Sequence, residues 1–196
     1  GGQARGGAKN HAVGLPDAAP EFAADARIGA AYGWAGERCR ASSAVVAVGA
    51  AGDPLVRLLE QKAKANKEGV DMGPLVTAQH RDKVAGYIDQ GVKEGAKLVV
   101  DGRAQKVRGF DDGYFLGTTL FDSVTPEMRI YQEEIFGPVL VVLRAGTLED
   151  AIALVNRNPF ANGTAIFTES GGAARRFENE IQVGMVGVNV PIPVPV

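Results

Sequence analysis

Short apolar runs with the character of buried strands alternate with helical patterns along most of this chain. Residues 44–48, 139–143 and 164–168 are mainly apolar, and each run is short enough for one strand. Strands that alternate with helices favour a mostly parallel sheet with helices on both faces, so the sequence predicts an α/β fold. The other predicted strands lie at 97–100, 115–121 and 185–190, and the predicted helices at 17–33, 54–67, 77–94, 147–156 and 173–181.

Polar residues that commonly cap helices stand at the start of several of these helical segments. Asp17, Asp53 and Thr77 each lie where a side-chain oxygen can accept a hydrogen bond from the first free backbone N–H groups. Thr147 and Asp150 have the spacing of a capping box. The sequence therefore predicts four capped helix starts.

A glycine turn at 49–52 follows one predicted strand and precedes a helix, an order also found in dinucleotide-binding folds. Gly49 and Gly52 lack the three-glycine spacing of such a fold. We interpret these glycines as a plain turn, with Pro54 at the first helical position, where no amide hydrogen is needed.

Composition excludes several classes of function. The 196 residues suit one domain, or at most one and a half, and the 45% hydrophobic content permits a sizeable core. With 21 basic and 23 acidic residues the net charge is −2, which favours neither nucleic acid nor anionic membranes as a partner. No apolar run approaches the roughly 20 residues of a membrane span, and residues 1–7 contain no apolar stretch of a signal peptide.

The two histidines do not predict a metal site. His11 and His80 lie far apart, and no cysteine or carboxylate cluster accompanies either of them. We interpret His80 as part of a polar helix start. For His11 a local role near an active site stays open.

Cys39 is the only cysteine of the chain, so it cannot form an intrachain disulfide or a thiolate cluster. It follows Gly36 at a turn between a helix and a strand, and the positive charge of Arg38 beside it favours the reactive thiolate. This setting suits a nucleophile. The alternative is a buried core residue, because free cysteines are among the most buried side chains.

Several ordered motifs are shared with one family of enzymes. Residues 132–139 read Gln-Glu-Glu-Ile-Phe-Gly-Pro-Val, residues 71–76 read Asp-Met-Gly-Pro-Leu-Val, and similar matches occur at 113–121 and 156–167. Together with the Gly-Glu-Arg-Cys segment that ends at Cys39, they resemble the aldehyde dehydrogenase family. Within it, segments 7–11, 36–39 and 188–195 are similar to the CoA-acylating branch that oxidises methylmalonate semialdehyde.

The resemblance implies a role for several residues. Cys39 would be the nucleophile that forms a thioester with the substrate. Glu134 would bind the nicotinamide ribose hydroxyls of NAD, and Phe136 would pack near the nicotinamide. Beside the nucleophile, the guanidinium of Arg38 could grip the carboxylate of a malonate-type semialdehyde with two parallel bonds; the alternative is that Arg38 only packs and tunes Cys39.

One departure from the family pattern concerns the acceptor of the thioester. Hydrolytic members carry a water-activating glutamate about four residues before the lysine that matches Lys9, and this position holds Arg5 here. None of residues 1–9 is acidic. The resemblance therefore implies that CoA, rather than water, takes the acyl group. A hydrolytic aldehyde dehydrogenase and an inactive domain that serves only in self-association are the alternatives.

The resemblance covers essentially the whole chain and also implies what lies outside it. Residues 1–196 match a thiol-bearing catalytic domain that is truncated at both ends, with most of the dinucleotide-binding domain upstream. The oxyanion-binding asparagine of the family would also lie upstream. A full-length protein of this kind is expected to act on small-molecule aldehydes as a homo-oligomer, in bacterial cytoplasm or in the mitochondrial matrix.

Overall fold

The computed structural model describes residues 7–192 and contains a seven-stranded sheet with the order β3-β4-β5-β2-β1-β6-β7. Every neighbouring pair is parallel except β3 with β4, which are antiparallel at one edge. The predicted α/β fold with a mostly parallel sheet is confirmed. The strands are β1 (Asn10–Gly14), β2 (Ser42–Val48), β3 (Lys97–Val100), β4 (Thr119–Asp122), β5 (Val139–Ala145), β6 (Gly163–Phe167) and β7 (Met185–Val188).

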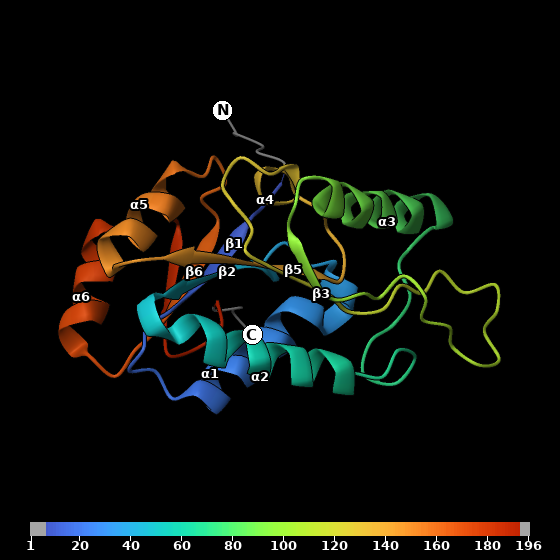
Figure 1. Ribbon diagram of the computed structural model, residues 1–196, viewed down its shortest axis with the longest axis horizontal. Helices are drawn as coiled ribbons and strands as arrows, with labels where there is room; N and C mark the ends of the chain where they lie inside the picture. The colour runs from blue at the N-terminus through green and yellow to red at the C-terminus, as the bar shows by residue number, and fades with distance from the viewer. Residues whose placement is uncertain (1–6, 193–196) are drawn as a thin grey trace.

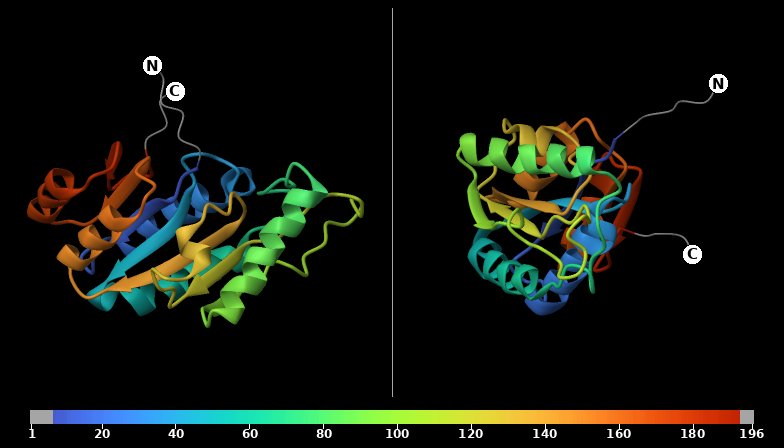
Figure 2. Two further views of the ribbon diagram at one scale, coloured as in Figure 1. Left: turned by 90° about the horizontal axis from the view of Figure 1, so that it is seen from above. Right: turned by 90° about the vertical axis from the view of Figure 1, so that its right-hand side faces the viewer.

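Helices cover both faces of the sheet (Figure 1). One side carries α1 (Pro20–Tyr32) and α2 (Gly52–Ala65), and the other carries α3 (Ala78–Lys93), α4 (Arg129–Gln132), α5 (Leu148–Arg157) and α6 (Gly171–Glu180). The end-on view in Figure 2 shows α3 on one side and the α1–α2 pair on the other. Short 3-10 turns, η1 (Gly33–Gly36) and η2 (Gly49–Ala51), complete the elements.

Strand β2 shows why two cores form. Side chains alternate across a strand, so Val46 and Val48 belong to the core under α3 and α5, whereas Val45 and Ala47 belong to the core over α1 and α2. The strand is apolar on both faces because both faces are buried, as is usual for parallel sheets.

Two of the predicted helix caps are confirmed. Thr77 accepts a hydrogen bond from the His80 amide at 3.1 Å at the start of α3. Thr147 and Asp150 form the predicted capping box of α5, with the Asp150 amide 3.1 Å from the Thr147 hydroxyl and the Thr147 amide 3.0 Å from the Asp150 carboxylate.

The other two predicted caps are wrong, because each carboxylate has a tertiary partner. Helix α1 begins at Pro20, and the Asp17 carboxylate instead accepts the Thr168 hydroxyl at 2.8 Å. Helix α2 begins at Gly52, so Asp53 lies inside its first turn and pairs with Arg144 at 2.6 Å. Pro54 is accordingly not the first helical residue.

Element boundaries differ from the prediction in a few places. Strand β1 and the short helix α4 were not predicted, and the predicted strand 115–121 begins only at Thr119. The segment before β4 is held by the loop beside it instead, since the Gly117 amide donates to the Gly102 carbonyl at 2.9 Å. In the described part of the chain, no helix is long and apolar enough to cross a membrane.

The parallel arrangement brings four distant segments to one edge. Strands β5, β2, β1 and β6 are neighbours and run in the same direction. The residues just before each of them therefore meet at the amino-terminal edge of the sheet. Those segments contain Glu134, Cys39, Lys9 and Asn162, in the order of the strands.

Candidate functional site

Cys39 lies at an exposed turn that leads into β2. The Ala41 amide closes this turn by donating to the Arg38 carbonyl at 3.0 Å. Gly36, at a φ of +71°, packs so closely that an added Cβ would lie 2.2 Å from the Gly137 carbonyl oxygen. The exposure of Cys39 removes the alternative of a buried core residue, and the Gly36 contact fixes the turn against the segment that carries Glu134.

Cys39 and Glu134 line one cleft of about 650 Å³. Its other walls are formed by Gly7, Ala8, Arg40 and residues 159–162. The structure thus brings together the predicted nucleophile and one predicted cofactor ligand.

Within the described part of the chain, the Glu134 carboxylate is held from one side only. The Ala8 amide donates a hydrogen bond to its Oε1 at 2.8 Å, and no other described residue donates to this carboxylate. A Cβ placed on Gly7 would lie 3.4 Å from Glu134 Oε2 and 2.7 Å from the Phe160 ring, so glycine keeps this part of the cleft open. The Oε2 of this half-buried residue therefore remains able to accept hydrogen bonds from a ligand.

Lys9 is a buried lysine behind the site, and the sequence did not assign it a function. Its side chain is 1% exposed, and its Nζ donates to the Ile130 carbonyl at 2.7 Å and to the Glu133 carbonyl at 2.9 Å. Burial lowers its pKa to about 7, while the nearby Glu134 and Glu133 charges oppose that shift. Lys9 thus ties the start of β1 to the segment that carries Glu134.

The lowered Lys9 pKa predicts a pH dependence of stability. Above pH 7 the folded chain releases this proton while the unfolded chain keeps it up to about pH 10.4. Between these two pH values the unfolded state binds more protons than the folded state. The free energy of unfolding should therefore rise by about 1.4 kcal/mol per pH unit more than it does in Lys9→Met. Urea unfolding at several pH values measures it. Lys93→Met, which removes an exposed lysine, should follow the unmodified chain, and equal slopes in all three proteins would contradict the prediction.

Arg38 and Phe136 lie on a second, much smaller cavity beside the cleft. This space of about 20 Å³ is also lined by Glu134 and Gly137. Arg38 runs past Gly33, and its buried Nε has no hydrogen-bond partner among the described residues. Phe136 is 38% exposed and has a left-handed backbone, with a φ of 57°. Glu134 lines both cavities, whereas Arg38 does not line the Cys39 cleft.

His80 lies in the first turn of α3, as predicted, and it also makes contacts outside the helix. Its Nε2–H donates to the Phe136 carbonyl at 2.6 Å, and Nε2 lies 3.5 Å from a Glu37 carboxylate oxygen. The centroids of the His80 and Phe136 rings are 6.2 Å apart. The start of α3 is thereby joined to the Phe136 turn, a contact for which the local sequence gives no signal.

His11 is buried within β1, with its Nε2 2.9 Å from the Tyr131 hydroxyl. Burial, together with the charge of Lys9, lowers its pKa to about 3, so the ring is neutral at pH 7. It lines neither the Cys39 cleft nor the Arg38 cavity. In the part of the chain that the structure describes, no group of three or more potential metal ligands occurs.

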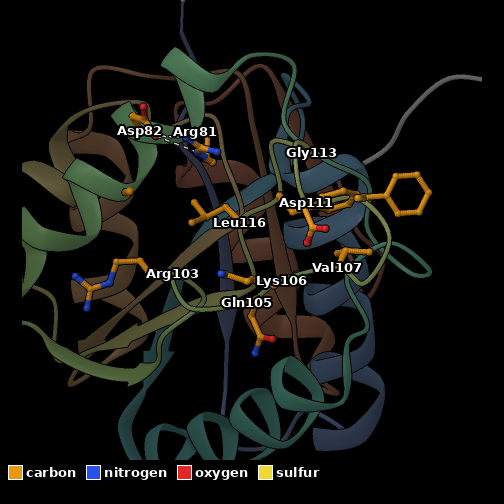
Figure 3. A pocket seen from close by; sticks show the side chains of 12 residues that line it. Arg81, Asp82, Arg103, Gln105, Lys106, Val107, Asp111, Gly113 and Leu116 are labelled. Carbon is orange, nitrogen blue, oxygen red and sulfur yellow. Dashed lines mark hydrogen bonds and ion pairs between the residues drawn. The ribbon is translucent and has the colours of Figure 1, made fainter.

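A further surface cavity of about 370 Å³ lies between α3 and the loop after β3 (Figure 3). Its arginines are paired, Arg81 with Asp82 at 2.8 Å and Arg103 with Asp101 and Asp89. It shares no lining residue with the Cys39 cleft. Arg5 and residues 193–196 lie outside the described residues, so the structure does not address the predicted departure at Arg5.

Comparison with known proteins identifies the family of the chain. Residues 3–196 match the aldehyde dehydrogenase family. The chain is 58% identical to the malonate-semialdehyde dehydrogenase of Pseudomonas aeruginosa, with 99% of this chain and 40% of that protein covered. It is 50% identical to the mitochondrial acylating methylmalonate-semialdehyde/malonate-semialdehyde dehydrogenase of Bos taurus, over 96% of this chain and 36% of that protein.

A solved structure of a related protein has the same fold as this chain. A protein assigned as methylmalonate-semialdehyde dehydrogenase from Sinorhizobium meliloti, in complex with NAD, is 49% identical with a TM-score of 0.95, over 97% of this chain and 40% of that one. The chain thus spans about 40% of the length of these relatives. The resemblance carried by the sequence motifs is confirmed, and this chain belongs to the aldehyde dehydrogenase family.

Proposed function

We propose that this chain is the thiol-bearing part of an enzyme that oxidises malonate or methylmalonate semialdehyde with NAD and releases an acyl-CoA. The observation that carries the proposal is the single cleft shared by the exposed Cys39 thiol and the half-buried Glu134 carboxylate. The names of the relatives in Pseudomonas aeruginosa and Bos taurus support the choice of substrate, and the bovine name supports the acylating chemistry.

Cys39 supplies the covalent chemistry. Its thiolate Sγ attacks the aldehyde carbon, and the carbonyl electron pair moves to oxygen, which gives a thiohemiacetal anion. The backbone N–H of Cys39 would stabilise this oxyanion, and one such preorganised donor contributes roughly 3–4 kcal/mol. Bound NAD would accept the hydride that leaves the former aldehyde carbon. The carbon–oxygen double bond then re-forms as a thioester on Cys39, and the CoA thiol displaces the Cys39 thiolate from it.

Glu134 and Phe136 fit the nicotinamide end of NAD. An ionised carboxylate with one oxygen bound to the Ala8 amide has its second oxygen left for ribose hydroxyls, which form short, strong bonds to a charged acceptor. The exposed Phe136 ring lies two residues away and offers an apolar surface for the nicotinamide ring. The chain thereby supplies an acceptor in the Cys39 cleft and a packing surface on the small cavity that Glu134 also lines.

Arg38 remains a proposed ligand for the substrate carboxylate. Its buried Nε has no partner among the described residues, which leaves donor capacity for a carboxylate. The 20 Å³ cavity that it lines is too small for a semialdehyde, so binding requires the guanidinium to turn toward the Cys39 cleft. Packing beside Cys39, the alternative drawn from the sequence, needs no such movement.

The proposal extends to the state of the whole protein. Its partners would be the aldehyde and CoA as small-molecule substrates, and further copies of itself in a homo-oligomer. The compartment would be bacterial cytoplasm or the mitochondrial matrix, and the name of the bovine relative supports the second for a eukaryotic protein.

The thioester itself provides the test. The full-length protein, incubated with propanal and NAD but without CoA, should carry one propionyl group on the peptide that contains Cys39, as measured by mass spectrometry. Omission of NAD should prevent the adduct, because the thiohemiacetal is reversible. Formation of NADH with the acyl group on another residue would overturn the proposal.

Glu134→Gln should weaken NAD use more than it weakens the fold. The amide oxygen of glutamine can still accept from Ala8, whereas the charge-assisted bonds to the ribose are lost, at about 1.5–3 kcal/mol. We expect the KM for NAD to rise roughly 10- to 150-fold, with little change in melting temperature. Glu133→Gln is the matched control, because Glu133 contacts Tyr87 and Arg129 at the surface instead. A lower melting temperature with unchanged kinetics would make Glu134 a structural residue.

A further inference from the structure

The backbone carbonyl of Cys39 accepts hydrogen bonds from two asparagine side chains. Asn10 Nδ2 lies 2.9 Å and Asn162 Nδ2 lies 2.7 Å from this one oxygen. Asn10 is the first residue of β1, and Asn162 directly precedes β6. Strands β1 and β6 are paired, so the two amides reach the turn of Cys39 from adjacent strands of the sheet.

Asn10 fixes more than this single oxygen. Its side chain is 1% exposed, its Nδ2 also donates to the Ala41 carbonyl at 3.0 Å, and its Oδ1 accepts from the Gly163 amide at 3.1 Å. Asn10 thus joins the carbonyls on both sides of Arg40 to the start of β6. The turn of Cys39 cannot rotate without breaking these bonds.

Asn162 contributes its bond from the wall of the cleft. It is half-buried and lines the same space as Cys39. At this position its amide could be hydrated by solvent. It instead donates to the carbonyl of the residue that carries the thiol, which fixes the peptide plane next to the reacting atom.

We infer that Asn162 and Asn10 are positioning residues that fix the Cys39 backbone, so that the thiol meets the aldehyde carbon in a productive geometry. The inference rests on the proposed function, because it requires Cys39 to be the nucleophile. With the carbonyl held twice and the turn closed by the Ala41 amide, the side-chain torsions of Cys39 remain as the main freedom of Sγ. Misplacement of a reacting group by about 1 Å can slow a reaction by about 100-fold.

Asn162→Leu in the full-length protein tests this role. The substitution keeps the approximate size of the side chain and removes the donor to Cys39. The rate of the first NADH burst with propanal and NAD should fall about 10- to 100-fold. Alkylation of Cys39 by iodoacetamide can be followed by mass spectrometry. Its rate depends on the ionised fraction and the accessibility of the thiol, not on the orientation of the thiol toward the aldehyde, so this rate should change by less than about threefold.

Asn156→Leu is the matched control. Asn156 is also half-buried and makes two hydrogen bonds, with the Glu180 carbonyl at 2.9 Å and the Gln182 amide at 2.8 Å, but these bonds join α5 to the end of α6. The burst rate of the Asn156→Leu protein should match that of the wild type. Asn162→Gln, which keeps a donor at the end of a longer side chain, should recover part of the rate lost in Asn162→Leu.

Three results would overturn the inference while leaving the nucleophile intact. These are a burst in Asn162→Leu within about twofold of wild type, an equal loss in Asn156→Leu, and a fall in alkylation as large as the fall in the burst. Failure of the proposed function has a different signature, because Cys39→Ser would then retain the burst.

Discussion

Cys39→Ser in the full-length protein should lose aldehyde oxidation by at least about a thousandfold, while the melting temperature stays nearly constant. A serine hydroxyl is far less ionised than a thiol and needs a general base. Neither histidine in the described part of the chain can serve, because His11 contacts Tyr131 in the interior and His80 contacts the Phe136 carbonyl. The side chain is exposed, so the exchange should alter stability by no more than about 0.5 kcal/mol.

The measurement is steady-state NADH formation with propanal and CoA, together with thermal unfolding of both proteins. Ser43→Ala is a useful control, because it changes a hydroxyl close to Cys39 in sequence without touching the thiol. Activity of Cys39→Ser within about tenfold of wild type would remove Cys39 as the nucleophile. A large fall in melting temperature would instead assign it a structural role.

The sheet could be predicted from the sequence because its central strands are apolar on both faces. The run at 44–48 leaves few alternatives to a strand buried between two layers. Strand β1 occupies a central place too, yet it begins with Asn10 and His11. Those polar side chains are buried because Cys39, Ala41 and Tyr131 satisfy them, and such partners are invisible in the local pattern.

The motifs of the candidate site were easier to recognise in the sequence than its geometry. The motifs around Cys39 and Glu134 could be recognised one by one, but only the parallel strand order places them in one cleft. Lys9, Asn10 and Asn162 act on backbone carbonyls of distant segments. A carbonyl has no side-chain signature, so a sequence pattern does not disclose which one will accept. The same holds for the Phe136 carbonyl, which binds His80, a residue that the sequence placed only in a polar helix start.

Without CoA, the full-length protein should give one burst of NADH and then nearly stop, whereas steady turnover should follow when CoA is added. Water is a weak nucleophile and needs a base within hydrogen-bond reach of the thioester, a contribution of about 100- to 10,000-fold. Among the described residues, Glu134 is the one carboxylate that lines the Cys39 cleft, and the Ala8 amide holds it there. CoA supplies a thiol that is partly ionised near neutral pH and needs no such help.

Stopped-flow NADH formation separates the burst from the later rate, and mass spectrometry identifies the product as acyl-CoA or free acid. The CoA-independent rate should be at least about 100-fold below the rate with CoA. Arg5→Glu places a carboxylate where hydrolytic relatives carry theirs, so it should raise the CoA-independent rate, and Arg5→Gln should not. Steady release of free acid without CoA, at a rate comparable to that with CoA, would mean that another base reaches the thioester. The enzyme would then belong with the hydrolytic aldehyde dehydrogenases, and the acyl group on Cys39 would have no need to wait for a thiol.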